Sequence, residues 1–332
     1  MRKRILTGDR PTGRLHLGHY VGSLKNRIRL QREYECFFII ADLHTLTTNQ
    51  DTSRTKENVR DLVLDQLSVG IDPTKVSFCI QSQIPEDQEL FTILSMLVSK
   101  SRLERMPTLK EVMRDLKIEH ATVGLLSYPV LQAADIMMVR ANLVPIGKDQ
   151  ASHLELTRQI AEEFNRTYGE VFPVPEALIP KDIGTLPGTD GKMKMSKSVG
   201  NVINLSDTPE TVRKQVMSMY TDPNRVHGDE PGKVDGNPVF VYLDAFSSHG
   251  DVKKIEDLKK RYEKGTVKDV EVKEYLVEVL ERFLEPVREM RAKFESQPGL
   301  VGKILREGTQ RAREEAQRTL TEVKRAMKLD YF

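Results

Sequence analysis

Apolar side chains follow two different rhythms in the first part of the chain. The run at 35–41 is almost continuously apolar, which predicts a strand buried on both faces, and shorter apolar runs within 4–7 and 76–81 predict two further strands. Between them, apolar residues recur every three or four positions in 18–33 and 53–69, which is the spacing of amphipathic helices. Because strand and helix alternate with short connections, the pattern predicts a parallel sheet of Rossmann type.

The following stretches add helices and one more strand. Residues 86–140 are mainly helical by the same spacing, and we expect them to form an insert within the sheet domain. A short strand is predicted at 142–145, followed by a helix for which Asp149 is the expected N-cap. The proline-rich segment 173–187 predicts a loop.

The pattern changes near residue 205. Strand signals stop there, and Thr208 followed by Pro209 marks the start of the first of several further helices. The sequence therefore predicts an α/β protein with two parts. These are a Rossmann-type parallel-sheet domain over 1–204 and a helical C-terminal domain over 205–332.

Composition narrows the class of protein. The 332 residues are 39% hydrophobic and 30% charged, and no apolar run approaches the length of a membrane-spanning helix, about 18 residues. The N-terminus lacks the apolar stretch of a signal peptide. Cys36 and Cys79 lie in apolar runs, which indicates buried thiols rather than a disulfide or a metal site. We therefore expect a cytoplasmic protein with no resident metal and no membrane association.

The charge balance gives little information about partners. The formal net charge is +2, so any nucleic-acid contact would depend on local basic patches. The mixed charges of the predicted C-terminal helices are typical of solvated helix faces.

Candidate chemistry begins directly after the first predicted strand. Gly8 and Gly13 bracket a tight bend, and His16 and His19 follow at the first turn of the next helix. Positions three apart share a helix face, so both imidazoles would lie beside the unpaired N–H groups of the helix N-terminus. That arrangement predicts an anion site, with a polyphosphate as the expected anion. The alternative is an ordinary turn followed by two surface histidines.

A second motif lies far downstream, in a stretch with three lysines at 191–201. It contains Lys194-Met195-Ser196-Lys197-Ser198, the string KMSKS, whereas His16-Leu17-Gly18-His19 has the form HIGH with leucine for isoleucine. The pair of motifs resembles the class I aminoacyl-tRNA synthetases. Activating an amino acid with ATP requires positioning and stabilisation of phosphate charge rather than a covalent enzyme intermediate. The candidate catalytic residues are His16, His19, Lys194 and Lys197.

One predicted helix in the insert carries polar residues on an otherwise apolar face. Tyr128, Gln132 and Asp135 are spaced four and three apart, so they share that face. Buried polar groups need partners. These side chains could bond to one another or to nearby backbone. They could instead form the polar edge of an apolar pocket that recognises one hydrogen-bonding group of a substrate.

Over nearly its whole length the chain resembles the bacterial-type tryptophanyl-tRNA synthetases. The resemblance rests on 7–24, on 128–129 with 133–136, and on 144–158 with 164–165, and this last group discriminates best against the tyrosine enzymes. It implies a catalytic sheet domain, a tRNA-binding helical domain and the substrates tryptophan, ATP with Mg²⁺, and tRNA(Trp). It also implies a homodimer.

The same resemblance implies the site residues. Asp135 would accept the indole N–H, because an indole only donates and a carboxylate only accepts. The tryptophan site would comprise Tyr128, Gln132, Asp135 and Gln150. The ATP site would comprise Arg10, Pro11, Thr12, Gly18, His19, Gly147, Lys148, Asp149, Leu186, Lys194, Met195, Ser196, Lys197 and Ser198.

Two positions depart from the family pattern. Gln132 stands where many bacterial tryptophan enzymes have methionine, and glutamine there is usual in the tyrosine enzymes. Lys148 replaces a commoner glutamate near the ATP. The alternatives are a tyrosyl-tRNA synthetase, a small nucleotidyltransferase of the same superfamily, and an auxiliary or regulatory synthetase paralogue. The intact histidines and lysines of both motifs argue against lost chemistry.

Overall fold

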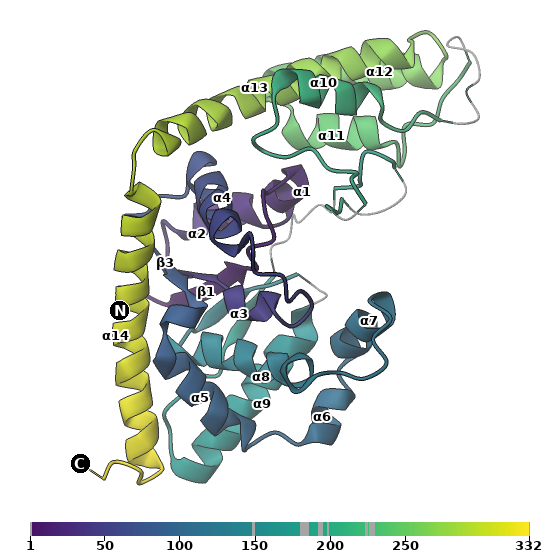
Figure 1. Ribbon diagram of the computed structural model, residues 1–332. Coiled ribbons are helices and arrows are strands. Elements are labelled where there is room, and N and C mark those ends of the chain that lie inside the picture. Colours follow the sequence, from purple (N-terminus) through teal and green to yellow (C-terminus); the bar gives the residue numbers. More distant parts are fainter. Residues whose placement is uncertain are drawn as a thin grey trace.

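The computed structural model describes residues 2–147, 150–179, 186–191, 195–197, 199–222, 225 and 230–331. A parallel five-stranded sheet lies at the centre, in the order β3-β2-β1-β4-β5 (Figure 1). The predicted Rossmann-type sheet is thereby confirmed. The strands are β1 (Arg4–Asp9), β2 (Glu35–Ile40), β3 (Val76–Ile80), β4 (Leu143–Pro145) and β5 (Glu176–Leu178).

Strand β2 is buried on both faces, as its continuous apolar run predicts. Successive side chains of a strand point to opposite faces, so Phe37 and Phe38 belong to two different hydrophobic clusters. The Phe38 cluster extends into the helical C-terminal part, and the Phe37 cluster includes the helices of the insert. Cys36 and Cys79 are buried free thiols.

The segment 173–187 contains β5, so the prediction of a loop throughout that segment was wrong. Glu176 and Ala177 of β5 are exposed, and the strand has only three residues. Its pairing depends on β4, because Val144 aligns with Ala177 in parallel register. A short exposed edge strand has no apolar pattern, and this explains why the sequence did not reveal it.

The helix predicted over 18–33 forms in three consecutive parts: α1 (Leu17–His19), a π-helical turn (Tyr20–Leu24) and α2 (Lys25–Leu30). Such turns are often found at functional sites. The spacing of apolar residues does not reveal a π-helical turn, because the helix continues in the same direction on both sides of it. After β2 come α3 (Asp42–Thr45) and α4 (Thr55–Ser68).

The insert is mainly helical, as predicted. A short 3₁₀ turn (Gln81–Gln83) follows β3, and α8 packs against α5 on one side and α9 on the other. Figure 1 shows α6 and α7 standing beside this group. The bounds are α5 (Pro85–Ser95), α6 (Lys100–Glu104), α7 (Pro107–Asp115), α8 (Val123–Met138) and α9 (Ala151–Tyr168).

The described residues after 205 form helices joined by turns and loops, with no strand among them. Its elements are α10 (Pro209–Met217), α11 (Pro238–Phe246), a 3₁₀ turn (His249–Asp251), α12 (Val252–Glu263), α13 (Asp269–Glu295) and α14 (Leu300–Ala326). Thr208 caps α10 by accepting a hydrogen bond from the backbone of Thr211. None of the described helices is long and apolar enough to span a membrane.

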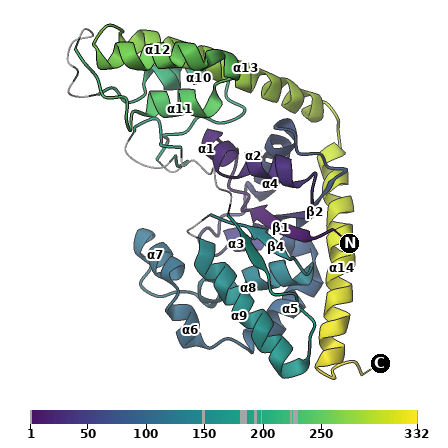
Figure 2. The ribbon, with the colours of Figure 1, turned by 180° about the vertical axis from the view of Figure 1, so that it is seen from behind.

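The last helix does not stay with the other C-terminal helices. Figures 1 and 2 show α10–α13 gathered at one end of the molecule, whereas α14 runs along the sheet domain. Gly308 of α14 lies so close to β3 that a Cβ atom there would be 2.0 Å from the carbonyl oxygen of Phe78. The helix therefore packs directly on the β3 backbone, and the domain boundary at 204/205 stays a prediction.

Candidate functional site

A cavity of about 670 Å³ opens at the carboxyl ends of β1 and β4. Open parallel sheets bind their ligands at this edge. Of the sequence-predicted site residues, its lining contains Arg10, Tyr128, Gln132, Asp135, Gly147 and Gln150. The remaining predicted residues that the structure describes lie outside the lining: Pro11, Thr12, His16, Gly18, His19, Leu186, Met195, Ser196 and Lys197. Lys148, Asp149, Lys194 and Ser198 lie outside the described residues.

The two histidines of the first motif meet at the start of α1. His16 is the N-cap residue, and its backbone N–H donates to Nδ1 of His19 over 3.1 Å. The two rings have their centroids 3.7 Å apart. Spacing of three on a short helical turn thus brings both imidazoles together, as the sequence predicts.

The lysine motif packs directly against this helix start. The backbone N–H of Gly18 points to the sulfur of Met195 over 3.4 Å, and a Cβ atom on Gly18 would come 3.0 Å from the His16 ring. The absence of a side chain at Gly18 therefore leaves room for the His16 ring. Leu186 is buried, and its carbonyl oxygen accepts from the backbone of Met195.

Lys197 reaches the bend that precedes His16. Its ammonium nitrogen donates to the carbonyl oxygen of Gly13 over 2.9 Å and lies 3.3 Å from that of Thr12. Burial lowers the pKa of Lys197, and the charges of Asp65 and Asp9 oppose that shift. An ammonium group on this bend adds positive charge beside the histidine pair, where phosphate groups would be stabilised.

Asp135 is a buried carboxylate on the cavity wall, with 3% of its surface exposed. Its two oxygens have separate partners: His44 Nε2 at 2.9 Å and Gln81 Nε2 at 2.8 Å. Each carboxylate oxygen can accept more than one hydrogen bond. Asp135 is therefore held in place and still able to accept an N–H from a ligand.

Tyr128 lies on the same wall and pairs with a histidine rather than with Asp135. Its hydroxyl lies 2.9 Å from Nε2 of His153, which is also 3.1 Å from the hydroxyl of Thr108. Burial raises the pKa of Tyr128. The described bonds of Tyr128 and Asp135 thus run to side chains on other elements and not to each other.

A second carboxyl group lies near Asp135. Asp87 of α5 is fully buried, and burial together with the negative charge of Asp135 raises its pKa well above the ordinary value. Both effects favour the neutral form of the Asp87 carboxyl group.

Sequence reasoning missed several polar residues around the cavity: His44, Gln81, Asp87 and His153. Two of them follow the carboxyl ends of strands, since His44 lies in α3 after β2 and Gln81 comes directly after β3. Polar residues directly after buried strands are a usable signal for such a site. His153 and Asp87 lie within helical stretches, and nothing in their spacing marks them. In the described part of the chain, no group of three or more metal-ligating side chains is placed to hold a metal ion.

The fold and the site define an α/β protein in which a histidine motif and a lysine motif meet near the carboxyl edge of a parallel sheet. Residues 2–285 match the family model described as tRNA synthetases class I (W and Y). The chain therefore belongs to the class I tRNA synthetase family for tryptophan and tyrosine.

Named relatives cover the chain almost from end to end. It is 55% identical to the tryptophan–tRNA ligase of Treponema pallidum over 329 residues, 98% of this chain and 97% of that protein. It is 49% identical to that of Chlamydia caviae, over 99% of this chain and 96% of the relative.

A similar solved structure is a tryptophanyl-tRNA synthetase from Campylobacter jejuni complexed with ADP and tryptophan. It has a TM-score of 0.87 and 35% sequence identity, and the match covers 98% of this chain and 99% of that one.

Proposed function

We propose that this protein is a tryptophan–tRNA ligase. It activates L-tryptophan with ATP to tryptophanyl-adenylate, releases pyrophosphate, and transfers tryptophan to the 3′ end of tRNA(Trp). The observation that carries this proposal is the buried Asp135, held by His44 and Gln81 on the wall of a cavity at the sheet edge. Its carboxylate suits the indole N–H, and the named relatives indicate tryptophan rather than tyrosine.

The predicted site residues divide into two groups. Tyr128, Gln132, Asp135 and Gln150 would hold tryptophan, and Arg10, Pro11, Thr12, Gly18 and Gly147 would lie along ATP. Leu186, Met195 and Ser196 would complete the ATP site, together with Lys148, Asp149, Lys194 and Ser198, which lie outside the described residues.

In the first step the tryptophan carboxylate attacks the α-phosphate. An oxygen–phosphorus bond forms, and the bond to pyrophosphate breaks. His16, His19, Lys194 and Lys197 would stabilise the charge that spreads over the phosphate oxygens. We expect Mg²⁺ to accompany ATP through phosphate oxygens and water, with few direct protein ligands.

The helical part of the chain supplies the expected tRNA surface. We propose that residues 1–204 form the catalytic domain and 205–332 the tRNA-binding domain. The protein would act as a homodimer in the cytoplasm, where its tRNA substrate is used.

Aminoacylation with purified tRNA transcripts tests this function. We expect tryptophan to be attached to tRNA(Trp) and not to tRNA(Tyr). Formation of the adenylate without charging of tRNA(Trp) would instead indicate a regulatory paralogue. Charging of tRNA(Tyr) with tyrosine would overturn the amino-acid assignment.

A further inference from the structure

The backbone around His16 is held by two separate parts of the chain. The N–H of Leu17 donates to Ile203, and the carbonyl oxygen of Leu15 accepts from Leu205, each over 2.9 Å. The N–H of Leu15 donates to the Asp65 carboxylate over 2.7 Å. The position of His16 therefore depends on Asp65 as well as on the 203–205 segment.

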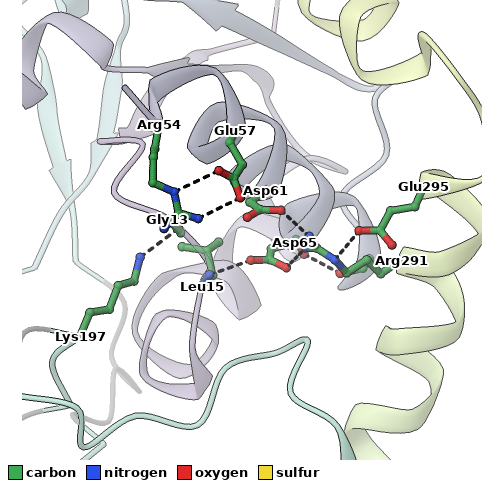
Figure 3. A network of polar contacts seen from close by, with 10 residues as sticks. Gly13, Leu15, Arg54, Glu57, Asp61, Asp65, Lys197, Arg291 and Glu295 are labelled. Carbon is green, nitrogen blue, oxygen red and sulfur yellow. Dashed lines mark hydrogen bonds and ion pairs between the residues drawn. The ribbon is translucent and has the colours of Figure 1, made fainter. Parts of the chain in front are cut away.

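Asp65 lies on α4 and is fully buried. Its Oδ2 atom accepts from Leu15, and its Oδ1 atom accepts from Nη1 of Arg291, near the end of α13 (Figure 3). The same guanidinium donates to Asp61 over 2.6 Å and to Glu295 over 3.0 Å. A continuous set of contacts thus joins α13, through α4, to the residue directly before His16.

Lys197 completes this network from the other side of the bend. Figure 3 shows its ammonium group pointing to Gly13, two residues before the Leu15 amide that Asp65 binds. The bend therefore lies between an ammonium group of the lysine motif and a carboxylate that is held by α13. A displacement of Arg291 would be transmitted to both motifs.

The charge state of Asp65 depends on its neighbours. Burial raises the pKa of Asp65 to about 6, with the negative Asp61 adding to the rise and Arg291 acting against it. Lys197 from the lysine motif is a further cation near it. Loss of the Arg291 charge would leave a buried carboxyl group that takes up a proton more readily. A neutral carboxyl group accepts a weaker hydrogen bond from Leu15 than a carboxylate does.

We propose that Arg291 and Asp65 are positioning residues for the activation step. They fix the backbone at 13–16 and thereby set the place of His16 and of the Lys197 contact, although neither touches the cavity. This inference rests on the proposed function, because it concerns the step in which ATP reacts.

The test compares Arg291→Met and Asp65→Asn with the wild type and with the conservative variant Arg291→Lys. Arg213→Met is the matched control, since it breaks an exposed arginine–glutamate pair between α10 and α13. The protein contains no tryptophan. The affinity for the amino acid can therefore be followed by the fluorescence of the bound tryptophan itself. The affinity for ATP is measured separately by calorimetry.

We expect Arg291→Met and Asp65→Asn to lower kcat/KM for ATP in pyrophosphate exchange by at least about 10-fold, since small misplacements of reacting groups have large effects. Tryptophan affinity should stay within about twofold, because these residues do not line the cavity, and Arg291→Lys should recover part of the loss. In Arg291→Met the acid limb of the pH profile should move to higher pH.

If Arg291 and Asp65 had only a structural role, Arg291→Met and Asp65→Asn would have lower melting temperatures, and the kinetics of the folded variants would equal those of Arg213→Met. That result would overturn the proposal, as would ATP affinity and exchange rates equal to the wild type. Absence of tryptophan-dependent exchange in the wild type would count against the proposed function instead. The calorimetric ATP affinities of the variants would still test the network in that case.

Discussion

The ammonium nitrogen of Lys197 lies 2.9 Å from the carbonyl oxygen of Gly13. Residues from two distant parts of the chain therefore meet at the bend that precedes the histidine pair. The contact places a cation on the bend that follows β1, and the carboxyl end of β1 lines the cavity whose wall carries the Asp135 carboxylate.

Replacing Lys197 by glutamine should slow adenylate formation more than it weakens tryptophan binding. Removing one preorganised charge from a transition state typically costs about 100-fold in rate, so we expect a loss of that order in pyrophosphate exchange. Lys303→Gln, an exposed lysine of α14, is the control and should behave as the wild type. Equal losses of rate and tryptophan affinity in Lys197→Gln would mean that the lysine has a structural role.

Asp135→Asn should weaken the use of tryptophan. A hydrogen bond to a charged group contributes about 1.5–3 kcal/mol, so kcat/KM for tryptophan should fall about 10- to 100-fold. The variant should keep its fold, because the amide oxygen still accepts from one of the two partners. Glu155→Gln on the exposed side of α9 is the control. An unchanged kcat/KM for tryptophan in steady-state exchange would remove Asp135 from the recognition site.

Gly308→Ala should destabilise the protein, although alanine favours helices. The added Cβ atom would lie 2.0 Å from the carbonyl oxygen of Phe78, and a strand backbone cannot move away easily. We expect a loss of about 3 kcal/mol in the free energy of unfolding. Gly302→Ala, earlier in α14, meets only the end of the Arg306 side chain and should stabilise by about 0.5–1 kcal/mol. Urea unfolding of both variants decides whether α14 packs on β3 in solution.

Much of the sheet could be predicted because its strands carry continuous apolar runs. The run at 35–40 is one example. Phe37 and Phe38 lie on opposite faces of the strand, so both faces are apolar and the run predicts a buried strand. β5 was missed because its residues are exposed and its pairing comes from β4 alone.

The meeting of the two motifs could be predicted, but the partners of Asp135 could not. His44, Gln81 and Asp87 reach Asp135 only through tertiary packing, and no local spacing encodes that. The packing of α14 on β3 could not be predicted either, because the mixed charges of α14 are those of an ordinary solvent-exposed helix.

The pH dependence of stability should show the cost of burying Asp65. Its pKa is raised to about 6 in the folded state from an ordinary value near 3.8. The folded state therefore holds this proton more tightly than the unfolded chain, and stability falls as pH rises from about 4 to about 6. Over that window the unfolding free energy of the wild type should drop, relative to Asp65→Asn, by about 3 kcal/mol, since each pKa unit corresponds to about 1.4 kcal/mol. Urea titrations at several pH values measure the difference in unfolding free energy between the wild type and Asp65→Asn. A difference that does not change with pH would contradict the raised pKa of Asp65.

The most direct test of the central claim is pyrophosphate exchange into ATP with single amino acids. The proposed site predicts exchange that depends on tryptophan, with tyrosine at least about 100-fold less effective, since a pocket that fits an indole ring discriminates against a smaller phenol by shape. Exchange supported by tyrosine and not by tryptophan would contradict the assignment of the amino acid and leave the class of enzyme intact. Absence of exchange with both amino acids would contradict the proposed activity itself.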